Sequence, residues 1–147
     1  MIRVVVGAIV TRGEGDEKEI LMVQEGQERN RGRWNFPMGG LDDGEYIFEG
    51  ARREVREETG YEIELTGLNS IFSTNNGRPQ FVFFDARAVK GEGNKWSDDE
   101  EIMDMKWIPI DEVLKLDLRK PGGYAETILA RVKGGVSFPL ETVEEIR

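Results

Sequence analysis

The sequence predicts an α+β fold, an α/β/α sandwich in which a mixed β-sheet lies between helices. The first observation is that β-branched and apolar runs, which favour strands, occur before, between and after two segments whose residues favour helix. The second is that no internal repeat, low-complexity tract or long linker divides the 147 residues. We therefore expect a single domain over residues 1–147.

The first half of the chain is predicted to form two strands and one long helix. The predicted elements are strands at residues 4–11 and 19–24 around a hairpin loop, a polar stretch at 25–33, a glycine-rich acidic turn at 38–45 and a helix at 46–59. Gly60 is the expected end of that helix, because glycine readily takes the left-handed conformation that closes helices.

The second half is predicted to be mostly strands, with a closing helix. The predicted elements are strands at residues 61–66, 68–73, 80–89 and 105–108, an acidic loop at 91–101, a brief helix at 111–116 and a longer helix at 124–133. The last helix follows Pro121-Gly122-Gly123 and carries an apolar stripe of Ile128, Leu129 and Val132.

Charge and missing residue types limit the chemistry. The chain has 20 Lys and Arg against 29 Asp and Glu, a formal net charge of −9, and it has no cysteine and no histidine. Disulfides, thiolate zinc sites, Cys or His nucleophiles and histidine general bases are therefore excluded. Catalysis would depend on carboxylates, Lys, Arg, Tyr, Ser or Thr, or on a metal ion.

The acidic balance also bears on partners. Nucleic acids and anionic membranes both favour clusters of Lys and Arg, so neither is expected as the main partner. No uncharged apolar run approaches the roughly 18 residues that a membrane-spanning helix needs. We expect a cytoplasmic protein that acts on a small molecule as a monomer or a homodimer.

Three carboxylates share one face of the predicted helix at 46–59. Glu54, Glu57 and Glu58 lie beside the apolar stripe, which consists of Ile47, Phe48, Ala51 and Val55. Carboxylates at these spacings repel each other by roughly a few tenths of a kcal/mol per pair. Helices rich in Glu and Arg are ordinarily solvated, but here the acids border the apolar side, which favours a cation between them.

The stretch from Gly39 to Tyr61 reads Gly-x5-Glu-x7-Arg-Glu-Val-Arg-Glu-Glu-Thr-Gly-Tyr. It resembles the Nudix box, Gly-x5-Glu-x7-Arg-Glu-U-x-Glu-Glu-x-Gly-U with U bulky and apolar, at every specified position. The resemblance is strong over residues 34–61 and implies the Nudix fold. Before the box this chain reads Pro37-Met38-Gly39, where many relatives read Pro-Gly-Gly, so an altered loop shape is expected.

The resemblance implies a divalent-metal site. It assigns Glu54, Glu57 and Glu58 as metal ligands, with the backbone carbonyl of Gly39 as a further one. It also implies that Arg53 orients the neighbouring carboxylates by ion pairing and that Glu45 braces the turn against the helix. Hard oxygen ligands without His or Cys select Mg²⁺, with Mn²⁺ as a substitute.

The implied reaction is hydrolysis of a phosphoanhydride, in which the cation neutralises charge on the phosphate oxygens. Without histidine, the proton acceptor is a carboxylate or the metal-bound hydroxide. The candidates are Glu57, Glu58 and an acid of the loop at 97–101. Because several relatives place a catalytic Glu in such a loop, upstream of a Trp like Trp107, Glu101 fits best and Glu100 next, although a merely solvated acidic loop stays open.

The sequence identifies substrate-binding residues less specifically than it identifies the metal ligands. Arg33 and Arg78 are the arginines expected near the box, where each could bind phosphate through its guanidinium, although a surface role is the alternative. Trp34, with Phe36 and Tyr124, could stack on a base, although aromatic residues beside strands more often belong to the core.

The expected function is thus that of a Mg²⁺-dependent Nudix pyrophosphohydrolase acting on a nucleoside di- or triphosphate or a related nucleoside-diphosphate-linked molecule. The segments at 118–121 and 138–141 loosely resemble a Nudix subgroup that acts on nucleoside tri- and diphosphates and thiamine-type pyrophosphates. ADP-ribose and dinucleoside polyphosphates stay open as substrates. The alternative is a Nudix-fold sensor that binds a nucleotide or nucleotide-sugar without turnover.

Overall fold

The computed structural model describes residues 2–75, 77–91, 101–119 and 123–147. The strands are β1 (Val4–Arg12), β2 (Glu19–Glu25), β3 (Trp34–Asn35), β4 (Met38–Gly40), β5 (Glu62–Phe72), β6 (Gln80–Lys90) and β7 (Ile102–Pro109). The α-helices are α1 (Ile47–Thr59) and α2 (Tyr124–Gly134), and short 3₁₀ segments cover Gly15–Glu17, Glu28–Asn30, Ile110–Lys115 and Leu140–Thr142. The α+β class predicted from the sequence is confirmed.

Strand β1 lies at the centre of the sheet and pairs with three other strands. Residues 4–10 run parallel to β6, while residues 5–7 pair antiparallel with β4 on the opposite side. The end of β1, at Thr11 and Arg12, pairs with β2. Beyond these, β5 pairs with β6 at one edge, and β7 and β3 pair with β2. The sheet is therefore mixed, and β4 is an edge strand that has β1 as its partner.

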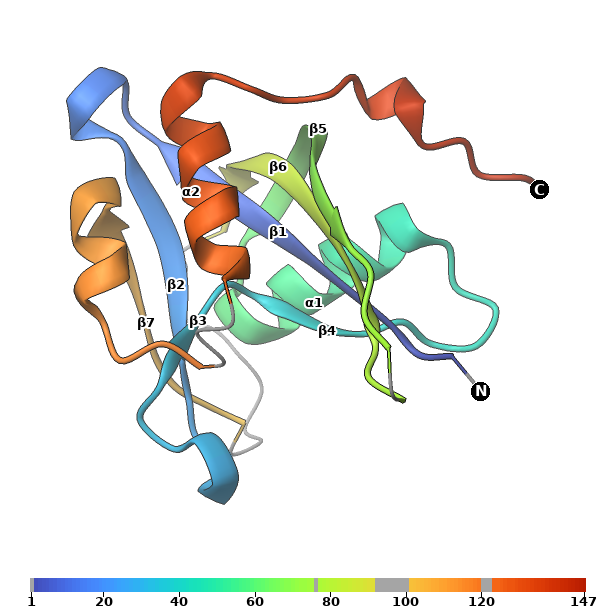
Figure 1. The fold of residues 1–147 in the computed structure, drawn as a ribbon, viewed down its shortest axis with the longest axis horizontal. Coiled ribbons are helices and arrows are strands. Elements are labelled where there is room, and N and C mark those ends of the chain that lie inside the picture. Colours follow the sequence, from blue (N-terminus) through green and yellow to red (C-terminus); the bar gives the residue numbers. More distant parts are fainter. Residues whose placement is uncertain (1, 76, 92–100, 120–122) are drawn as a thin grey trace.

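The side chains of β1 alternate between two apolar cores. Val6, Ala8 and Val10 pack in one core with Ala51 and Val55 of α1. Ile9 faces the other core, which α2 covers with residues such as Ile128, Leu129 and Val132. Figure 1 shows α2 in front of the strands and α1 behind them. Because both faces of β1 are covered, its sequence is a nearly continuous apolar run.

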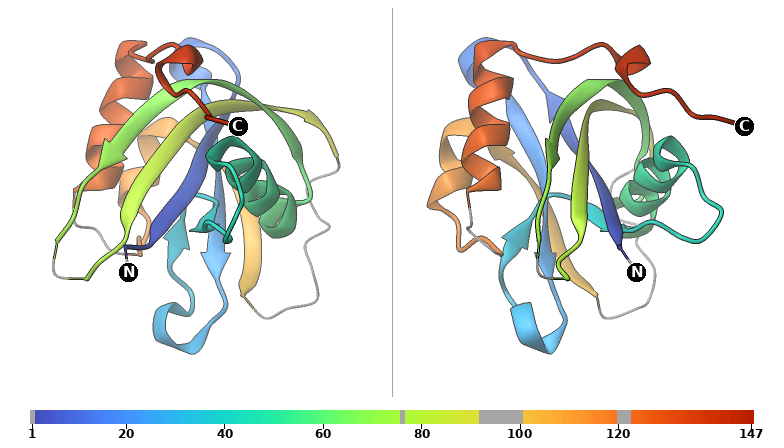
Figure 2. Two further views of the ribbon diagram at one scale, coloured as in Figure 1. Left: turned by 90° about the vertical axis from the view of Figure 1, so that its right-hand side faces the viewer. Right: turned by 45° about the vertical axis from the view of Figure 1, so that its right-hand side comes forward.

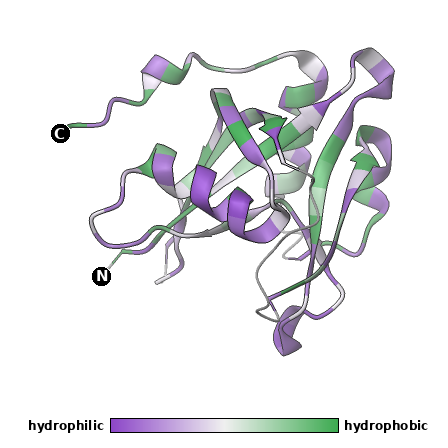
Figure 3. Cartoon of the chain, turned by 180° about the vertical axis from the view of Figure 1, so that it is seen from behind, coloured by the Kyte–Doolittle hydropathy of each residue, from purple (hydrophilic) through white to green (hydrophobic). Residues whose placement is uncertain are grey.

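Helix α1 is amphipathic and ends where the sequence predicts. Gly60 adopts φ 80°, and its N–H donates to the carbonyl of Arg56, which closes the helix in the left-handed conformation. In Figure 3, which views the molecule from behind, the outward surface of α1 is mostly hydrophilic. The helix thus buries one stripe against β1 and presents its polar residues near the edge strand β4. None of the described helices is long and apolar enough to span a bilayer.

The short strands β3 and β4 were not predicted, and two predicted strand regions have different bounds in the structure. The segments predicted separately at 61–66 and 68–73 form the single strand β5, whose register shifts around Gly67. A Cβ on Gly67 would overlap the Ser137 hydroxyl, so glycine is needed here because the C-terminal segment passes close by. Strand β7 begins at Ile102, earlier than predicted, and pairs with β2 along its length.

The segment after α2 crosses the sheet and ends beside the start of α1, as both views in Figure 2 show. On the way, the backbones of Leu68 and Phe138 exchange two hydrogen bonds of 2.8 and 2.9 Å. Near its end, the carbonyl of Ile146 accepts a hydrogen bond of 3.0 Å from the Tyr46 hydroxyl. The C-terminal segment therefore connects the α2 side of the sheet to the N-terminus of α1.

Candidate metal and substrate site

Helix α1 packs its acidic residues against the backbone of β4. The Glu58 carboxylate accepts a hydrogen bond of 3.2 Å from the Met38 N–H. A Cβ on Gly39 would overlap the Glu54 carboxylate, so this approach of helix to strand requires glycine at 39. By contrast, nothing lies within 4 Å of where a Cβ on Gly40 would be. The first glycine of the Nudix-like motif is thus required by direct contact with one of its glutamates.

Arg53 connects the glycine-rich turn to the acidic face. Its guanidinium donates two hydrogen bonds to Glu45, at 2.7 and 3.0 Å, and one of 3.0 Å to the Gly40 carbonyl. It also donates to Glu54 at 2.8 Å and to Glu57 at 3.2 Å. Since a guanidinium offers five N–H donors in a fixed plane, one side chain sets the positions of three carboxylates.

The same contacts shift the pKa values of the partners. The hydrogen bonds from Arg53 lower the pKa of Glu45, and those to Glu45 and Glu54 raise the pKa of Arg53. Arg53 is therefore a permanent cation and Glu45 a permanent anion near neutral pH. Glu45 also accepts a hydrogen bond of 3.0 Å from the Asp42 N–H, which fixes the turn before α1.

Burial has the opposite effect on the other two glutamates. Desolvation raises the pKa of Glu54, although the hydrogen bond from Arg53 opposes this. Desolvation raises the pKa of Glu58 well above its usual range, and the negative charges of Glu54, Glu25 and Glu101 raise it further. The site therefore concentrates negative charge where water is largely excluded, an arrangement that a bound cation would stabilise.

Two more acids reach this face from the ends of β2 and β7. Glu101 is held by its backbone carbonyl, which accepts a hydrogen bond of 2.6 Å from the Gly26 N–H, and its carboxylate accepts one of 3.4 Å from the Gln27 side chain. Glu25 is the last residue of β2, and its side chain is only 12% exposed. The remaining predicted acids of this loop, residues 98–100, lie outside the described part of the chain, Glu100 among them.

The residues present fit a divalent cation in donor chemistry. Glu54, Glu57, Glu58 and the Gly39 backbone offer oxygen donors, which suit Mg²⁺ and Mn²⁺. The partly buried Glu58 carboxylate has no ion pair with any basic side chain of the described residues. Among residues 2–75, 77–91, 101–119 and 123–147, no three acidic side chains are close enough together to hold a metal ion. Arg53 instead forms ion pairs with Glu54 and Glu57.

A cavity of about 760 Å³ lies on the other face of the sheet, beside β4. Its lining includes Arg3, Arg78 and Arg119, the aromatic residues Phe72, Phe81 and Tyr124, and the polar residues Asn35, Ser73, Thr74 and Thr127. Met38, Gly39 and Gly40 form the wall towards the acidic face. This volume is in the range of small-molecule sites, and the mixture of aromatic and cationic groups suits an aromatic anion.

Two cavity residues are fixed by hydrogen bonds. The Tyr124 hydroxyl donates to the Asn35 side-chain oxygen at 3.0 Å, and burial raises the pKa of Tyr124 to about 12. The Arg119 guanidinium pairs with Glu25 at 2.9 Å, and the backbone N–H of Arg119 donates to the Trp34 carbonyl at 2.8 Å. Arg119 thus links the cavity to the acidic face.

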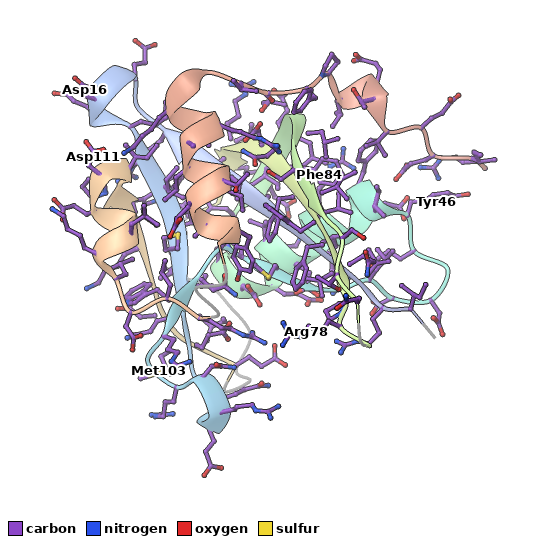
Figure 4. All side chains as sticks on the ribbon, in the orientation of Figure 1. Asp16, Tyr46, Arg78, Phe84, Met103 and Asp111 are labelled. Atoms are coloured by element: carbon purple, nitrogen blue, oxygen red, sulfur yellow. The ribbon has the colours of Figure 1, made fainter. Side chains whose placement is uncertain are left out.

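The predicted substrate residues separate into two groups. Arg78 lines the cavity, and Figure 4 shows its side chain reaching from the β5–β6 turn towards the middle of the molecule. Arg33 and Trp34 are not among the residues that line it. Trp34 packs against the α2 core, and the Lys106 ammonium lies 5.9 Å from its ring centre. Of the other two aromatic candidates, Phe36 is buried and Tyr124 lines the cavity.

Sequence reasoning missed Glu25, Arg3 and Arg119. Glu25 reaches the acidic face because β2 pairs with β7, which places it opposite Ile102. Arg3 reaches the cavity because β1 pairs with β6, and the backbone N–H of Gln80 donates to the Arg3 carbonyl at 2.9 Å. The local sequence carries no signal for such pairings, since they join segments far apart in the chain.

Comparisons with known proteins agree with this arrangement. The model of the NUDIX domain matches residues 1–128. The chain is 34% identical over 115 residues to Nudix hydrolase 6 of Arabidopsis thaliana, covering 75% of this chain and 40% of that protein. It is 36% identical over 95 residues to the 8-oxo-dGDP phosphatase of Mus musculus, covering 64% of this chain and 29% of the mouse protein. The chain therefore spans less than half the length of these curated relatives.

The fold has solved counterparts as well. A NUDIX hydrolase from Nitrosomonas europaea superimposes with a TM-score of 0.83 at 25% identity, covering 99% of this chain and 98% of that one. The family model includes the acidic face of α1, the glycine-rich turn and most of the cavity. With its motif, its fold and the match over residues 1–128 in agreement, this chain belongs to the Nudix family.

Proposed function

We propose that the chain is a Mg²⁺-dependent pyrophosphohydrolase that cleaves a phosphoanhydride bond in a nucleoside di- or triphosphate, or in a related nucleoside-diphosphate-linked molecule. The observation that carries the proposal is the packing of two carboxylates, the buried Glu54 and the partly buried Glu58, against the backbone of β4. Glu54 pairs with Arg53, whereas Glu58 has no basic partner among the described residues. Because desolvated carboxylates are costly to fold, the placement of these two acids beside a cationic cavity supports a function that needs them.

In this proposal, Glu54, Glu57, Glu58 and the Gly39 carbonyl hold the metal. A bound divalent cation supplies charge neutralisation for the oxygens of the scissile anhydride. Arg53 positions Glu54 and Glu57, because its guanidinium already contacts both carboxylates and is itself fixed by Glu45. Mn²⁺ is expected to substitute for Mg²⁺, since both favour oxygen ligands.

The general base is assigned to Glu101, with Glu57 and Glu58 as the alternatives. Glu101 contributes to the negative potential at both Glu54 and Glu58, so it lies near the proposed metal ligands, yet it is exposed and belongs to the turn that precedes β7. An acid in that position can accept a proton from water without being a metal ligand itself.

The cavity is assigned to the nucleoside part of the substrate. Phe81 and Tyr124 offer aromatic surface for a base, and Arg78 offers a guanidinium for an anionic group. The cavity adjoins Met38, Gly39 and Gly40, so a substrate held there can place its phosphates at the edge of β4.

The test is a panel of substrates incubated with the purified protein and Mg²⁺, with products identified by mass. The panel contains nucleoside tri- and diphosphates, 8-oxo-dGDP, ADP-ribose, dinucleoside polyphosphates and thiamine pyrophosphate. Metal-dependent cleavage of at least one member is expected. Tight binding of a member without turnover of any would replace the proposal with a nucleotide sensor.

Variants separate the roles of the acids. Glu57→Gln is expected to abolish turnover while the fold is retained, as judged by circular dichroism. Glu101→Gln is expected to reduce kcat at least about tenfold, because general-base catalysis typically contributes more than that. A Glu101→Gln rate within threefold of the parent rate would remove Glu101 from the mechanism and leave Glu57 or Glu58 as the base.

A further inference from the structure

The cavity contains two arginines to which the proposed function assigns no role in binding the reacting phosphates. Arg3 precedes β1, and Arg78 belongs to the turn between β5 and β6. Both line the cavity, and neither forms an ion pair with any carboxylate of the described residues. Among the described residues, the cavity lining contains three arginines and neither Asp nor Glu, in a chain whose net charge is −9.

The sheet separates these arginines from the acidic face. Val6, Ala8 and Val10 of β1 face α1. Arg3 and Val5, which have the opposite parity along the chain, line the cavity on the other face. Strand β4 shows the same alternation, because Met38 packs with the α2 core whereas Gly39 contacts Glu54. The glutamates and the arginines therefore lie on opposite faces, with β4 between them as the edge.

Arg119 is placed differently from Arg3 and Arg78. Its guanidinium pairs with Glu25, whose negative charge is felt at Glu58, so Arg119 lies at the boundary between the cavity and the acidic face. This link to Glu25 favours Arg119 over the other two arginines as the partner of the reacting phosphates. Arg3 and Arg78 are then left for another part of the ligand.

We propose that the substrate carries a second anionic group on its non-reacting part, such as a phosphate on the ribose, and that Arg3 and Arg78 bind this group. The inference rests on the proposed function for the assignment of the acidic face as the reacting end. The substrate class is thus a nucleoside-diphosphate compound whose nucleoside bears an additional phosphate. Two guanidiniums without competing carboxylates suit a phosphate dianion, which they can bind through paired N–H donors.

Product-like nucleotides test this without any turnover. The probes are AMP, adenosine 2′,5′-bisphosphate and adenosine 3′,5′-bisphosphate, measured by calorimetry with the full chain, at low ionic strength and in the presence of Mg²⁺. At least one bisphosphate is expected to bind about tenfold more tightly than AMP, because one charge-assisted bidentate contact is worth about that factor. In the Arg3→Gln/Arg78→Gln variant this preference is expected to disappear.

The matched control is Arg29→Gln/Arg52→Gln, which removes the same charge from arginines that lie outside the cavity lining and form no ion pair with the described residues. This control is expected to retain the preference for the bisphosphate. Equal affinities for AMP and both bisphosphates, or binding of none of the three, would overturn the inference. If the Arg3→Gln/Arg78→Gln variant lost the same factor in affinity for AMP and for the bisphosphates, the inference would also be overturned, since the arginines would then bind the reacting phosphate chain.

The outcome is distinguishable from failure of the proposed function. A chain that hydrolyses nothing in the substrate panel but prefers a bisphosphate would retain the second anion site and lose the hydrolase assignment. A chain that hydrolyses a panel member but binds AMP and the bisphosphates equally would retain the hydrolase assignment and lose the second site.

Discussion

The Glu145 carboxylate accepts a hydrogen bond of 3.1 Å from the backbone N–H of Phe48, 97 positions earlier in the chain. Phe48 lies in the first turn of α1, and the N-cap residue of that helix, Tyr46, makes no side-chain capping bond. The first turn of a helix has N–H groups without intrahelical partners and a partial positive charge. The C-terminal segment therefore supplies the cap that α1 lacks.

Removal of this cap is expected to destabilise the protein modestly. Glu145→Ala should lower the free energy of unfolding by about 1 kcal/mol, as loss of a helix cap typically does. Urea denaturation monitored by circular dichroism gives the measurement. Glu144→Ala is the control, because Glu144 is exposed, and its effect should be within about 0.5 kcal/mol of zero. Equal effects of the two substitutions would show that Glu145 does not cap α1.

The contact between Gly39 and Glu54 predicts a sharp difference between adjacent glycines. Gly39→Ala should displace the Glu54 carboxylate, since the added Cβ would overlap it. We expect turnover to fall at least about tenfold, because small misplacements of catalytic groups are costly. The rise in melting temperature on addition of Mn²⁺ should shrink in parallel.

Gly40→Ala is the matched substitution for that experiment. The position of its Cβ is open, so turnover and the Mn²⁺ response should stay close to those of the parent chain. If both variants behaved alike, the contact between β4 and Glu54 would not matter for the metal site.

Arg53 is expected to contribute to both stability and activity. Arg53→Ala leaves Glu54, which is buried, without its ion-pair partner, and this should cost about 1–3 kcal/mol of unfolding free energy. Arg53→Lys should recover only part of this, because an ammonium cannot reach Glu45, Glu54 and Gly40 in one plane. Arg52→Ala on the same helix, measured by the same denaturation, is the control.

Glu58 is predicted to decrease the stability of the metal-free protein. Burial raises the pKa of its carboxyl, so the unfolded chain releases this proton more readily than the folded chain, and stability falls as pH rises above about 4.5. In metal-free protein at pH 7, Glu58→Gln should therefore raise both the melting temperature and the free energy of unfolding.

The same variant should respond less to metal. Added Mg²⁺ or Mn²⁺ should stabilise the parent chain more than Glu58→Gln, because a ligand has been removed. A Glu58→Gln variant that is less stable than the parent without metal would contradict the assignment of Glu58 as a buried acid retained for function.

Local signals in the sequence were sufficient to predict helix α1 and its acidic face. The apolar stripe ending at Val55, the terminating Gly60 and the spacing of the glutamates are all properties of neighbouring residues, and each has the predicted position in the structure. The hydrogen bond of Arg53 to Glu57 also joins residues four positions apart on one helix, a spacing at which side chains meet.

Features that depend on strand pairing could not be predicted in this way. Glu25 joins the acidic face only because β2 pairs with β7, and Arg3 meets Arg78 at one cavity only because β1 pairs with β6. The segments at 61–66 and 68–73 were predicted as two strands, whereas Gly67 between them makes room for Ser137 inside one strand. In each case the decisive contact comes from a distant segment.

The parallel pairing of β1 with β6 also limits the order in which the chain can fold. Residues 4–10 are synthesised early, but their partner in the ladder, residues 80–86, follows only after β2, β3, β4, α1 and β5. Until then the central strand has one edge unpaired, and closure of the long loop opposes its pairing. Formation of the β1–β6 ladder is therefore expected to limit the folding rate, and nascent chains that end before residue 80 cannot form this ladder.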